Sequence, residues 1–468
     1  MLFRSSSAHP CNLAGAAPPG AISGTASADA ALPVTVWDVT RLAGMTQTQP
    51  EKSTGLQEIR EILHGPVRRL FLATFINALG NGLTLTLFVV YLTAVRHIPV
   101  GRATLLLSWM AIVGMAVAPL VGTLTDKYGP RRVLMVCSVG MAAAVFSYGH
   151  IRSLRDAFIA CTASALASSG LWGPNTTMLA MCTPSHLRQR AFGLSFMLLN
   201  LGIGVGGLIG TRIVDTARPR SFELLYRLDS LSFIAILLIQ LTLKGYAGPS
   251  PKADDAGEEP RGWAEVLRDR TLLRYLASAL LLMVCGYGSI DVGLSYFATT
   301  EIGLPVNRLG IVLFVNTAAI VIAQLSILRR IEGRSRTRLL AAVGLLWAMS
   351  WIVNGLAVLP GTTGALVLLC LGQILFALGE TVWAPVAPAI VNDLAADDLR
   401  GRYNAAQSLL WTLAGTLSPM LAGVFLQRGA GLPWVVSLVL GCLLATMLFL
   451  GLRRRVSAHV DGRVAARN

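Results

Sequence analysis

The sequence predicts an all-α membrane protein with twelve transmembrane helices arranged as two six-helix bundles. Hydrophobic residues make up 54% of the 468-residue chain and charged residues only 13%, whereas soluble domains carry about 25% charged residues. About twelve apolar runs of roughly 20 residues are long enough to cross a hydrocarbon core of about 30 Å. Such runs satisfy their backbone hydrogen bonds as helices, because barrel strands would be shorter and would alternate in polarity.

The predicted spans follow one another through most of the chain, with short polar loops between them. Their bounds are approximate to a few residues, because the ends of apolar runs are weakly marked. The predicted spans are residues 70–95, 103–125, 133–150, 154–182, 190–214, 222–243, 272–298, 306–328, 338–358, 364–391, 403–427 and 433–452.

One polar break, longer than the others, separates the sixth predicted span from the seventh. Its first part is rich in Pro, Gly and acidic residues, which predicts a flexible linker. The sequence "WAEVLRDRTLL" at its end predicts a short amphipathic helix. The predicted organisation is an N-terminal tail at 1–66, a six-helix bundle at 67–243, a linker at 244–271, a second six-helix bundle at 272–452 and a basic tail at 453–468.

The chain carries a formal net charge of +15, and its Lys and Arg residues lie mostly in the loops between spans. Loops after the even-numbered spans hold roughly twice as many Lys and Arg as the others, and such an excess marks the cytoplasmic side. Both termini are then cytoplasmic, and the protein spans the plasma or inner membrane. We do not expect a nucleic acid partner, because no basic patch with stacking aromatic residues is present.

The first 66 residues include "LAGAAPPGAISGTASADAALP", which is rich in Ala, Gly, Pro and Ser. They contain no continuous apolar core of the length that a signal peptide requires. We therefore expect a disordered cytoplasmic tail. Met45 is an alternative to Met1 as the true start, which N-terminal sequencing would test.

Chemically reactive residue types give no sign of an enzyme, a cofactor or a metal centre. The seven cysteines show no CxxC spacing and are expected to serve as small apolar residues. The six histidines lie in tails, loops or loop edges, and the chain has no G-x-x-x-x-G-K-[ST] phosphate-binding loop. We expect no catalytic residue, no cofactor, no metal and no nucleotide as energy source.

An internal repeat relates the two halves of the chain. "LWGPNTTML" at 171–179 is similar to "VWAPVAPAI" at 382–390, and "LRQRAFG" at 187–193 is similar to "LRGRYNA" at 399–405. The repeat aligns the fourth span with the tenth and the fifth with the eleventh. Parallel duplications of this kind are a transporter architecture with a binding site near the membrane midplane, between the halves.

The loop after the second span carries a charged motif between two glycines. It fits G-x-x-x-D-[RK]-x-G-x-[RK]-[RK] at Gly122, Asp126, Lys127, Gly129, Arg131 and Arg132. In this loop of a twelve-span chain, the motif resembles the signature of the major facilitator superfamily, and the resemblance in architecture covers about residues 68–455. It implies two pseudo-symmetric bundles that give access to a central site alternately from each side.

Each residue type in the motif has a physical use. Gly122 allows two helices to approach closely, and Gly129 permits a tight turn. Asp126 can accept hydrogen bonds from the N-terminus of a neighbouring helix. The resemblance implies that this acid is a gate residue that latches the halves together on the cytoplasmic side in the outward-facing state. In "ILRRIEGRSRTR", the corresponding loop of the second half, Arg330 stands in the place of Asp126, so we expect a degenerate second latch.

The fifth span contains a run of glycines. Gly204 and Gly207 with Gly202 form a G-x-G-x-x-G pattern, but this lies inside an apolar span and not after a strand, which argues against a nucleotide site. Small residues at this spacing allow close helix packing or a bend. The spacing also resembles the glycine motif of the superfamily's proton-coupled exporters, although Gly207 occupies the place of the usual proline. The residues of this predicted motif are Gly193, Gly202, Gly206 and Gly210.

Two carboxylates within spans are candidates for proton coupling, because an ionisable residue there costs about 2.5 to 3.5 kcal/mol on insertion scales. Glu380 lies near the middle of the tenth span, where its repeat partner is Ser169. If Glu380 faces the cavity it could exchange protons, and otherwise it would bond a neighbouring helix. Asp229 has no obvious local partner in the sixth span, and a structural role is favoured for it.

Two pairs of polar or aromatic residues are candidates for lining the cavity. Asn77 and Asn81 are four residues apart and share a helix face, so they contact either substrate or another helix. Trp172 and Trp383 occupy matching repeat positions. Trp residues near span ends often anchor at the membrane interface, but this mid-span position favours stacking on a flat substrate.

The sequence therefore predicts a secondary transporter that resembles multidrug or metabolite efflux proteins. It would move a small amphipathic molecule by alternating access and exchange it for protons, with the bilayer, the substrate and protons as its partners. Uptake of a small polar solute is the alternative within the same fold. A membrane enzyme or receptor is disfavoured, and a monomer is expected.

Overall fold

The computed structural model describes residues 63, 65–84, 87–215, 218–245 and 262–463. Most of the predicted N-terminal tail, including Met45, lies outside the described residues, as does most of the linker before residue 262. Every regular element in the described part of the chain is helical, and no strand occurs among these residues. The predicted all-α membrane fold is confirmed.

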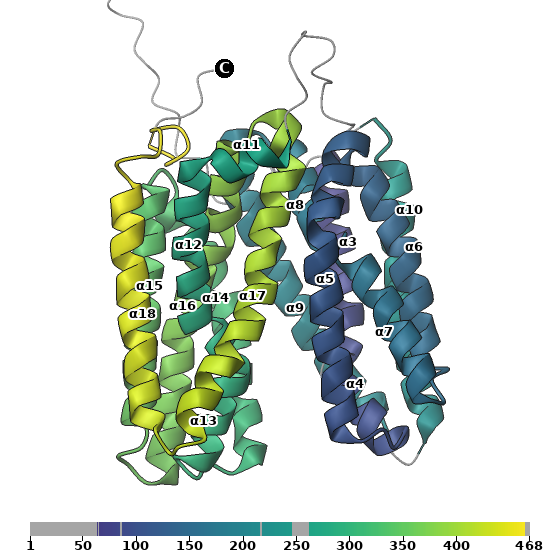
Figure 1. The fold of residues 1–468 in the computed structure, drawn as a ribbon, viewed down its shortest axis with the longest axis vertical. Helices are drawn as coiled ribbons and strands as arrows, with labels where there is room; N and C mark the ends of the chain where they lie inside the picture. The colour runs from purple at the N-terminus through teal and green to yellow at the C-terminus, as the bar shows by residue number, and fades with distance from the viewer. Residues whose placement is uncertain (1–62, 64, 85–86, 216–217, 246–261, 464–468) are drawn as a thin grey trace, which may run out of the picture. The chain divides into compact units, whose positions relative to one another are not determined.

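The first half of the chain forms a bundle of helices (Figure 1). Apolar residues dominate these helices, as expected for elements that face lipid on one side and other helices on the other. They are α3 (Gly65–Thr84), α4 (Phe88–Val90), η1 (Tyr91–Val95), α5 (Val100–Tyr128), α6 (Pro130–Tyr148), α7 (Leu154–Ser168), α8 (Trp172–Met181), η2 (Ser185–Leu187), α9 (Arg188–Ile213) and α10 (Pro219–Thr242).

The second half begins with a short helix at the end of the linker, where the amphipathic helix was predicted. Asp269 caps the following helix, because its Oδ1 accepts hydrogen bonds from the backbone N of Thr271 (2.8 Å) and of Leu272 (3.0 Å). The elements are α11 (Trp263–Arg268), α12 (Arg270–Cys285), η4 (Ile290–Leu294), α13 (Ser295–Thr300), α14 (Val306–Ile331), α15 (Arg336–Leu356), α16 (Thr362–Leu394), η5 (Asp397–Leu399), α17 (Arg400–Leu426) and α18 (Gly431–Leu452).

Ten helical segments of the described residues are long and apolar enough to cross a membrane. The other two predicted spans, 154–182 and 272–298, are interrupted helices. Gly170 lies at the first interruption, and a Cβ there would lie 2.2 Å from Cys137 Sγ. Gly286 lies at the second, where a Cβ would lie 2.1 Å from the Trp347 ring. Both breaks bring the backbone against a bulky neighbour, which only glycine allows.

Within the first bundle, α9 packs tightly against α3. A Cβ on Gly202 would lie 2.6 Å from Ala78 Cβ, and one on Gly206 would lie 2.2 Å from the Leu79 carbonyl oxygen. Gly210 has a similar environment, so these three glycines form one contact face. Gly193 does not belong to this face, because a Cβ there would meet Leu328 of α14.

The two bundles meet through several helix pairs: α5 and α8 pack against α17, and α9 packs against α14 and α16. Figure 1 shows α5 and α17 converging toward the end of the bundles where α11 lies. Gly122 permits this approach, because a Cβ at this residue would lie 2.7 Å from Ala405 Cβ. We call this end, where Gly122 of α5 meets Ala405 of α17, the closed end.

Candidate functional site

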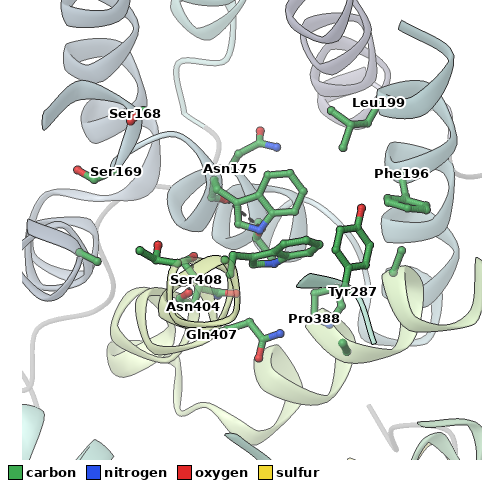
Figure 2. A pocket seen from close by; sticks show the side chains of 18 of the residues that line it. Ser168, Ser169, Asn175, Phe196, Leu199, Tyr287, Pro388, Asn404, Gln407 and Ser408 are labelled. Carbon is green, nitrogen blue, oxygen red and sulfur yellow. Dashed lines mark hydrogen bonds between the residues drawn. The ribbon is translucent and has the colours of Figure 1, made fainter. Parts of the chain in front are cut away.

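A cavity of about 740 Å³ lies between the two bundles. Its walls come from α3, α5, α7, α8 and α9 of the first bundle and from the segment after α12, α16 and α17 of the second, and Figure 2 shows side chains from both. Its lining includes Met110, Gly114, Ser168, Ser169, Trp172, Asn175, Phe192, Phe196, Leu199, Tyr287, Glu380, Trp383, Pro388, Asn404, Gln407, Ser408 and Trp411. A cavity of this size accommodates a small organic molecule.

Aromatic rings from both bundles face one another in the cavity wall. The ring centroids of Trp172 on α8 and Trp411 on α17 are 6.2 Å apart, and those of Trp411 and Tyr287 are 4.7 Å apart. Trp172 is 48% exposed, so a large indole surface is open to whatever enters. These rings offer stacking surface to a flat or amphipathic molecule.

Trp172 and Trp383, which the repeat paired, both line the cavity but differ in environment. Trp383 is buried, and its ring centroid lies 6.1 Å from that of Trp347. Trp172 makes its ring contact with Trp411. The matching positions therefore do not produce matching surfaces, because the helix around Trp172 is interrupted whereas α16 is continuous.

Glu380 is the single charged residue among the described residues that line the cavity. It lies within α16 and is 3% exposed. Asn316 of α14 donates a hydrogen bond from Nδ2 to Glu380 Oε2 at 2.7 Å. Ser169, its repeat partner, also lines the cavity. The arrangement puts one negative charge, or one acidic proton, beside an otherwise uncharged wall.

Amides and hydroxyls form a polar strip in the cavity lining, as Figure 2 shows for Asn175, Asn404, Gln407 and Ser408. Asn404 Nδ2 donates to Thr177 Oγ1 of the first bundle at 3.1 Å, and to Asn392 Oδ1 at 2.9 Å. The strip therefore also joins the two bundles.

At the closed end, Asp126 of α5 contacts the first turn of α17. Its Oδ1 accepts a hydrogen bond from the backbone N of Gly401 (2.5 Å). Its Oδ2 accepts from the backbone N of Arg402 (3.2 Å) and from Arg402 Nη1 (2.9 Å). A carboxylate at a helix N-terminus is stabilised by the unpaired N–H groups and by the positive end of the dipole.

The rest of the charged motif lies around this contact. Gly129 has φ of +85°, which favours glycine at the turn between α5 and α6. Arg131 donates to the carbonyl oxygens of Gln240 (2.7 Å) and Leu241 (3.3 Å) at the end of α10. Lys127 Nζ lies 5.3 Å from the Tyr128 ring centroid. Arg132 is exposed, and the structure gives no specific role for it.

A second ionic contact joins the bundles, between Arg190 of α9 and Glu332 at the end of α14. The repeat aligns Arg190 with Arg402, so this pair corresponds to the Asp126–Arg402 pair. The sequence alignment put Arg330 in the place of Asp126 and missed Glu332, which lies two residues further on. Helix α14 therefore ends with its own carboxylate near the partner bundle.

Three candidate polar residues lie outside the cavity lining. Asp229 of α10 accepts a hydrogen bond from Thr84 Oγ1 (2.8 Å) and another from Ser232 Oγ (3.3 Å), and it is 2% exposed. Asn81 Nδ2 donates to Asn77 Oδ1 at 3.2 Å. Asp229 therefore bonds from α10 to α3, whereas the bond between the two asparagines joins residues of the same helix, α3, and reaches neither another helix nor the cavity.

Sequence reasoning missed Trp411, Tyr287, Asn316 and Gln407. The sequence did contain a signal for Trp411. The spacing of three or four residues along α17 puts it on one helix face with Asn404, Ser408 and Gly415. For Tyr287 and Asn316 no sequence signal exists. Their places depend on the break after α12 and on the packing of α14 against α16.

Comparison with known proteins places this chain among membrane transporters. The model of the family described as the Major Facilitator Superfamily matches residues 70–354. A Na(+), Li(+), K(+)/H(+) antiporter of Planococcus maritimus is 22% identical over 72% of this chain and 84% of that protein. Multidrug resistance protein MdtH of Aeromonas hydrophila is 26% identical over 70% of this chain and 80% of that protein.

A solved structure shares the fold. The structure of a bacterial homologue of the iron transporter ferroportin in an outward-facing state has a TM-score of 0.70 with this chain. It is 14% identical and covers 84% of this chain and 100% of its own. At this identity the likeness concerns the fold alone.

Proposed function

Because this multi-pass membrane protein belongs to the major facilitator superfamily of transporters, we propose that it exports a small amphipathic molecule in exchange for protons. The favoured substrate carries a positive charge and a flat apolar body. The single observation that carries the proposal is Glu380, the lone charged residue in the described cavity lining.

Glu380 supports both the substrate class and the coupling. A carboxylate held in a mostly apolar wall attracts a cation, and the Trp172 and Trp411 rings offer stacking surface and cation–π contact. A cation and a proton would compete for the same carboxylate. Such competition is a direct way to exchange one for the other across the membrane.

The geometry of the closed end supports alternating access. Asp126 and Arg402, and Arg190 and Glu332, join the two bundles at the same end, away from the cavity midpoint. The excess of basic residues in these loops favours the cytoplasm for this side. We therefore take both termini as cytoplasmic and the closed end as the cytoplasmic gate, with the cavity accessible from outside.

The names of two relatives agree with this choice. One similar protein is named an antiporter that exchanges protons, and another is named a multidrug resistance protein. Exchange against protons and a broad range of organic substrates are both compatible with one carboxylate and several aromatic rings.

Proton exchange can be tested in proteoliposomes that contain a pH-sensitive dye. Ethidium, a flat aromatic cation, is expected to trigger proton movement in the wild type, whereas naphthalenesulfonate, a flat aromatic anion, is not. Glu380→Gln removes the charge and keeps the size of the side chain, so it should abolish the response. Glu301→Gln is the matched control, because Glu301 is exposed and outside the cavity lining. An equal response from Glu380→Gln and wild type would refute the role of Glu380.

Uptake of a small polar solute is a second candidate function. The amides of Asn175, Asn404 and Gln407, together with several hydroxyls in the lining, favour it. These groups can make directional hydrogen bonds to a hydroxylated solute. Uptake of a labelled sugar or polyol panel by the same proteoliposomes, with no response to organic cations, would favour this alternative.

A further inference from the structure

The chain segment that follows α18 packs on the N-terminus of α15, and Figure 1 shows it at the end of the yellow helix, on the same side of the molecule as the closed end. Val456 and Val460 are each 6% exposed, and Asp461 is fully buried. Backbone hydrogen bonds join Asp461 N to the Ser457 oxygen (3.0 Å) and Gly462 N to the His459 oxygen (2.9 Å). The sequence predicted only a basic tail here, but residues 456–463 are packed and hydrogen-bonded.

Asp461 caps the N-terminus of α15. Its Oδ1 accepts hydrogen bonds from Thr337 N (2.9 Å) and Thr337 Oγ1 (2.8 Å), and its Oδ2 accepts from Ser335 Oγ (2.7 Å). The carbonyl oxygen of Asp461 accepts from Arg336 N at 2.9 Å. Arg463 Nε lies 2.7 Å from Asp461 Oδ2. The local N-cap residue, Ser335, accepts from Arg338 N at 3.5 Å, and Asp461, 124 positions beyond Thr337, adds a second cap from far along the chain.

The same segment holds the side chain of Arg336, which is 5% exposed. Arg336 Nη1 donates to the Val460 carbonyl oxygen (2.9 Å) and to Asp393 Oδ2 of α16 (2.6 Å). The other oxygen of Asp393 forms an ion pair with Arg188 of α9. Asp393 therefore lies between one arginine of each bundle, and the C-terminal segment fixes one of the two.

We propose that residues 456–463 act as a clamp that positions Arg336 and thereby stabilises the state in which the two bundles meet at the closed end. When the closed end opens, Arg188 must leave Asp393, whose side chain is 1% exposed in this state. With the clamp in place, the Asp393 carboxylate is held by Arg336 in the geometry that Arg188 binds. Without it, Arg336 gains rotamer freedom, and the carboxylate is no longer preorganised for the partner bundle.

The clamp acts on the balance between conformational states and does not depend on which substrate is carried or on Glu380. Asp461 is thus a positioning residue that works through Arg336. We expect the loss of Asp461 to raise the population of the state in which the bundles separate at the closed end by about fivefold. This factor is at the lower end of the range for coupling between distant sites.

The distance between two spin labels measures this balance in the full chain in nanodiscs. Labels at Leu154→Cys, at the start of α7, and Leu359→Cys, after α15, lie at the end opposite the closed end and are exposed. They are introduced in a background without native cysteines. When the closed end opens, the opposite end narrows, so the labels approach one another. The variants are a stop after Arg455, Asp461→Ala and Asp461→Asn.

The stop and Asp461→Ala are expected to enlarge the short-distance population about fivefold relative to the parent. Asp461→Asn, which keeps one acceptor oxygen, should lie between them and the parent. His459→Ala is the matched control, because His459 is exposed in the same segment and should leave the distances unchanged. Unchanged distances in folded stop and Asp461→Ala variants, whatever their melting temperature, would overturn the proposal.

A second arm separates positioning from general loosening of the fold. Arg336→Ala should reproduce the shift seen for Asp461→Ala, and the two changes together should shift the distances no further than either alone. Additive shifts would mean that Asp461 acts by another route than Arg336 and would refute the clamp as stated.

Discussion

At the residue scale, single side chains of one bundle form hydrogen bonds and ion pairs with the other bundle. Asp126 has three hydrogen-bond donors on α17, of which two are backbone N–H groups at a helix N-terminus. Hydrogen bonds that involve an ionised carboxylate are roughly twice as strong as neutral ones. A second carboxylate, that of Glu332 in the other half, pairs with Arg190, so an acid–arginine contact between the bundles occurs twice with different geometry.

Replacing Asp126 by Asn removes the charge but keeps the side chain's shape. We expect transport to slow by about tenfold, because loss of a charge-assisted contact costs about 1.5 kcal/mol in the closed-end state. Membrane insertion and melting temperature should stay close to wild type. The measurement is the initial transport rate per folded protein in proteoliposomes. Glu301→Gln is the control, because Glu301 is exposed and outside both the charged motif and the cavity lining, and an Asp126→Asn rate equal to wild type would exclude a gating role.

At the element scale, the glycines of helix α9 face two different neighbouring helices, α3 and α14. Gly202, Gly206 and Gly210 meet α3 backbone and side chains, whereas Gly193 meets Leu328 of α14 in the other bundle. Gly204 lies in the same run, but a Cβ there would be 3.6 Å from the nearest atom, an ordinary contact with Thr317. The glycines of this run therefore differ in how closely a neighbouring helix approaches them, and so in how much an added Cβ would disturb the packing.

These environments predict opposite outcomes for two similar substitutions. In Gly206→Ala the new Cβ would lie 2.2 Å from the Leu79 carbonyl oxygen, so α3 and α9 must move apart. We expect a loss of about 1 to 3 kcal/mol in the free energy of unfolding, as for other overpacked sites. Gly204→Ala should be neutral or slightly stabilising. Thermal unfolding in detergent compares them, and equal melting temperatures would contradict the packing described.

At the scale of the whole described molecule, the contacts between bundles gather at the closed end and around the cavity. Two ionic pairs related by the internal repeat join α5 with α17 and α9 with α14. Because the two pairs lie on different helix pairs, separation of the bundles at the closed end must break both of them. The C-terminal segment adds a third contact through Arg336, Asp393 and Arg188.

A charge exchange tests whether the second pair acts between the bundles. Arg190→Glu alone puts two carboxylates together, and we expect it to weaken the closed end and change the transport rate by about fivefold or more. Arg190→Glu combined with Glu332→Arg restores opposite charges and should recover most of the wild-type rate. The double-mutant cycle is read from initial transport rates. A double variant no better than Arg190→Glu would argue against a direct pair.

The sequence by itself determined the class of fold, the order of the helices and the position of the charged motif after the second span. These follow from local properties: the length of apolar runs, the placement of charge, and a motif whose residues lie within eleven positions of one another. Glu380 was also accessible from the sequence, because a carboxylate in an apolar span stands out wherever it points.

Only the tertiary structure decided which polar residues face the cavity and which bond inside a bundle. Glu380 lines the cavity while Asp229 bonds Thr84, yet both are single acids in apolar helices. The difference is the rotation of each helix about its axis, which depends on packing against distant elements. The same holds for the interrupted α7–α8 segment, for Glu332 against Arg190, and for Asp461 against α15, since each contact joins residues far apart in the chain. A local pattern carries no information about partners that only folding brings together.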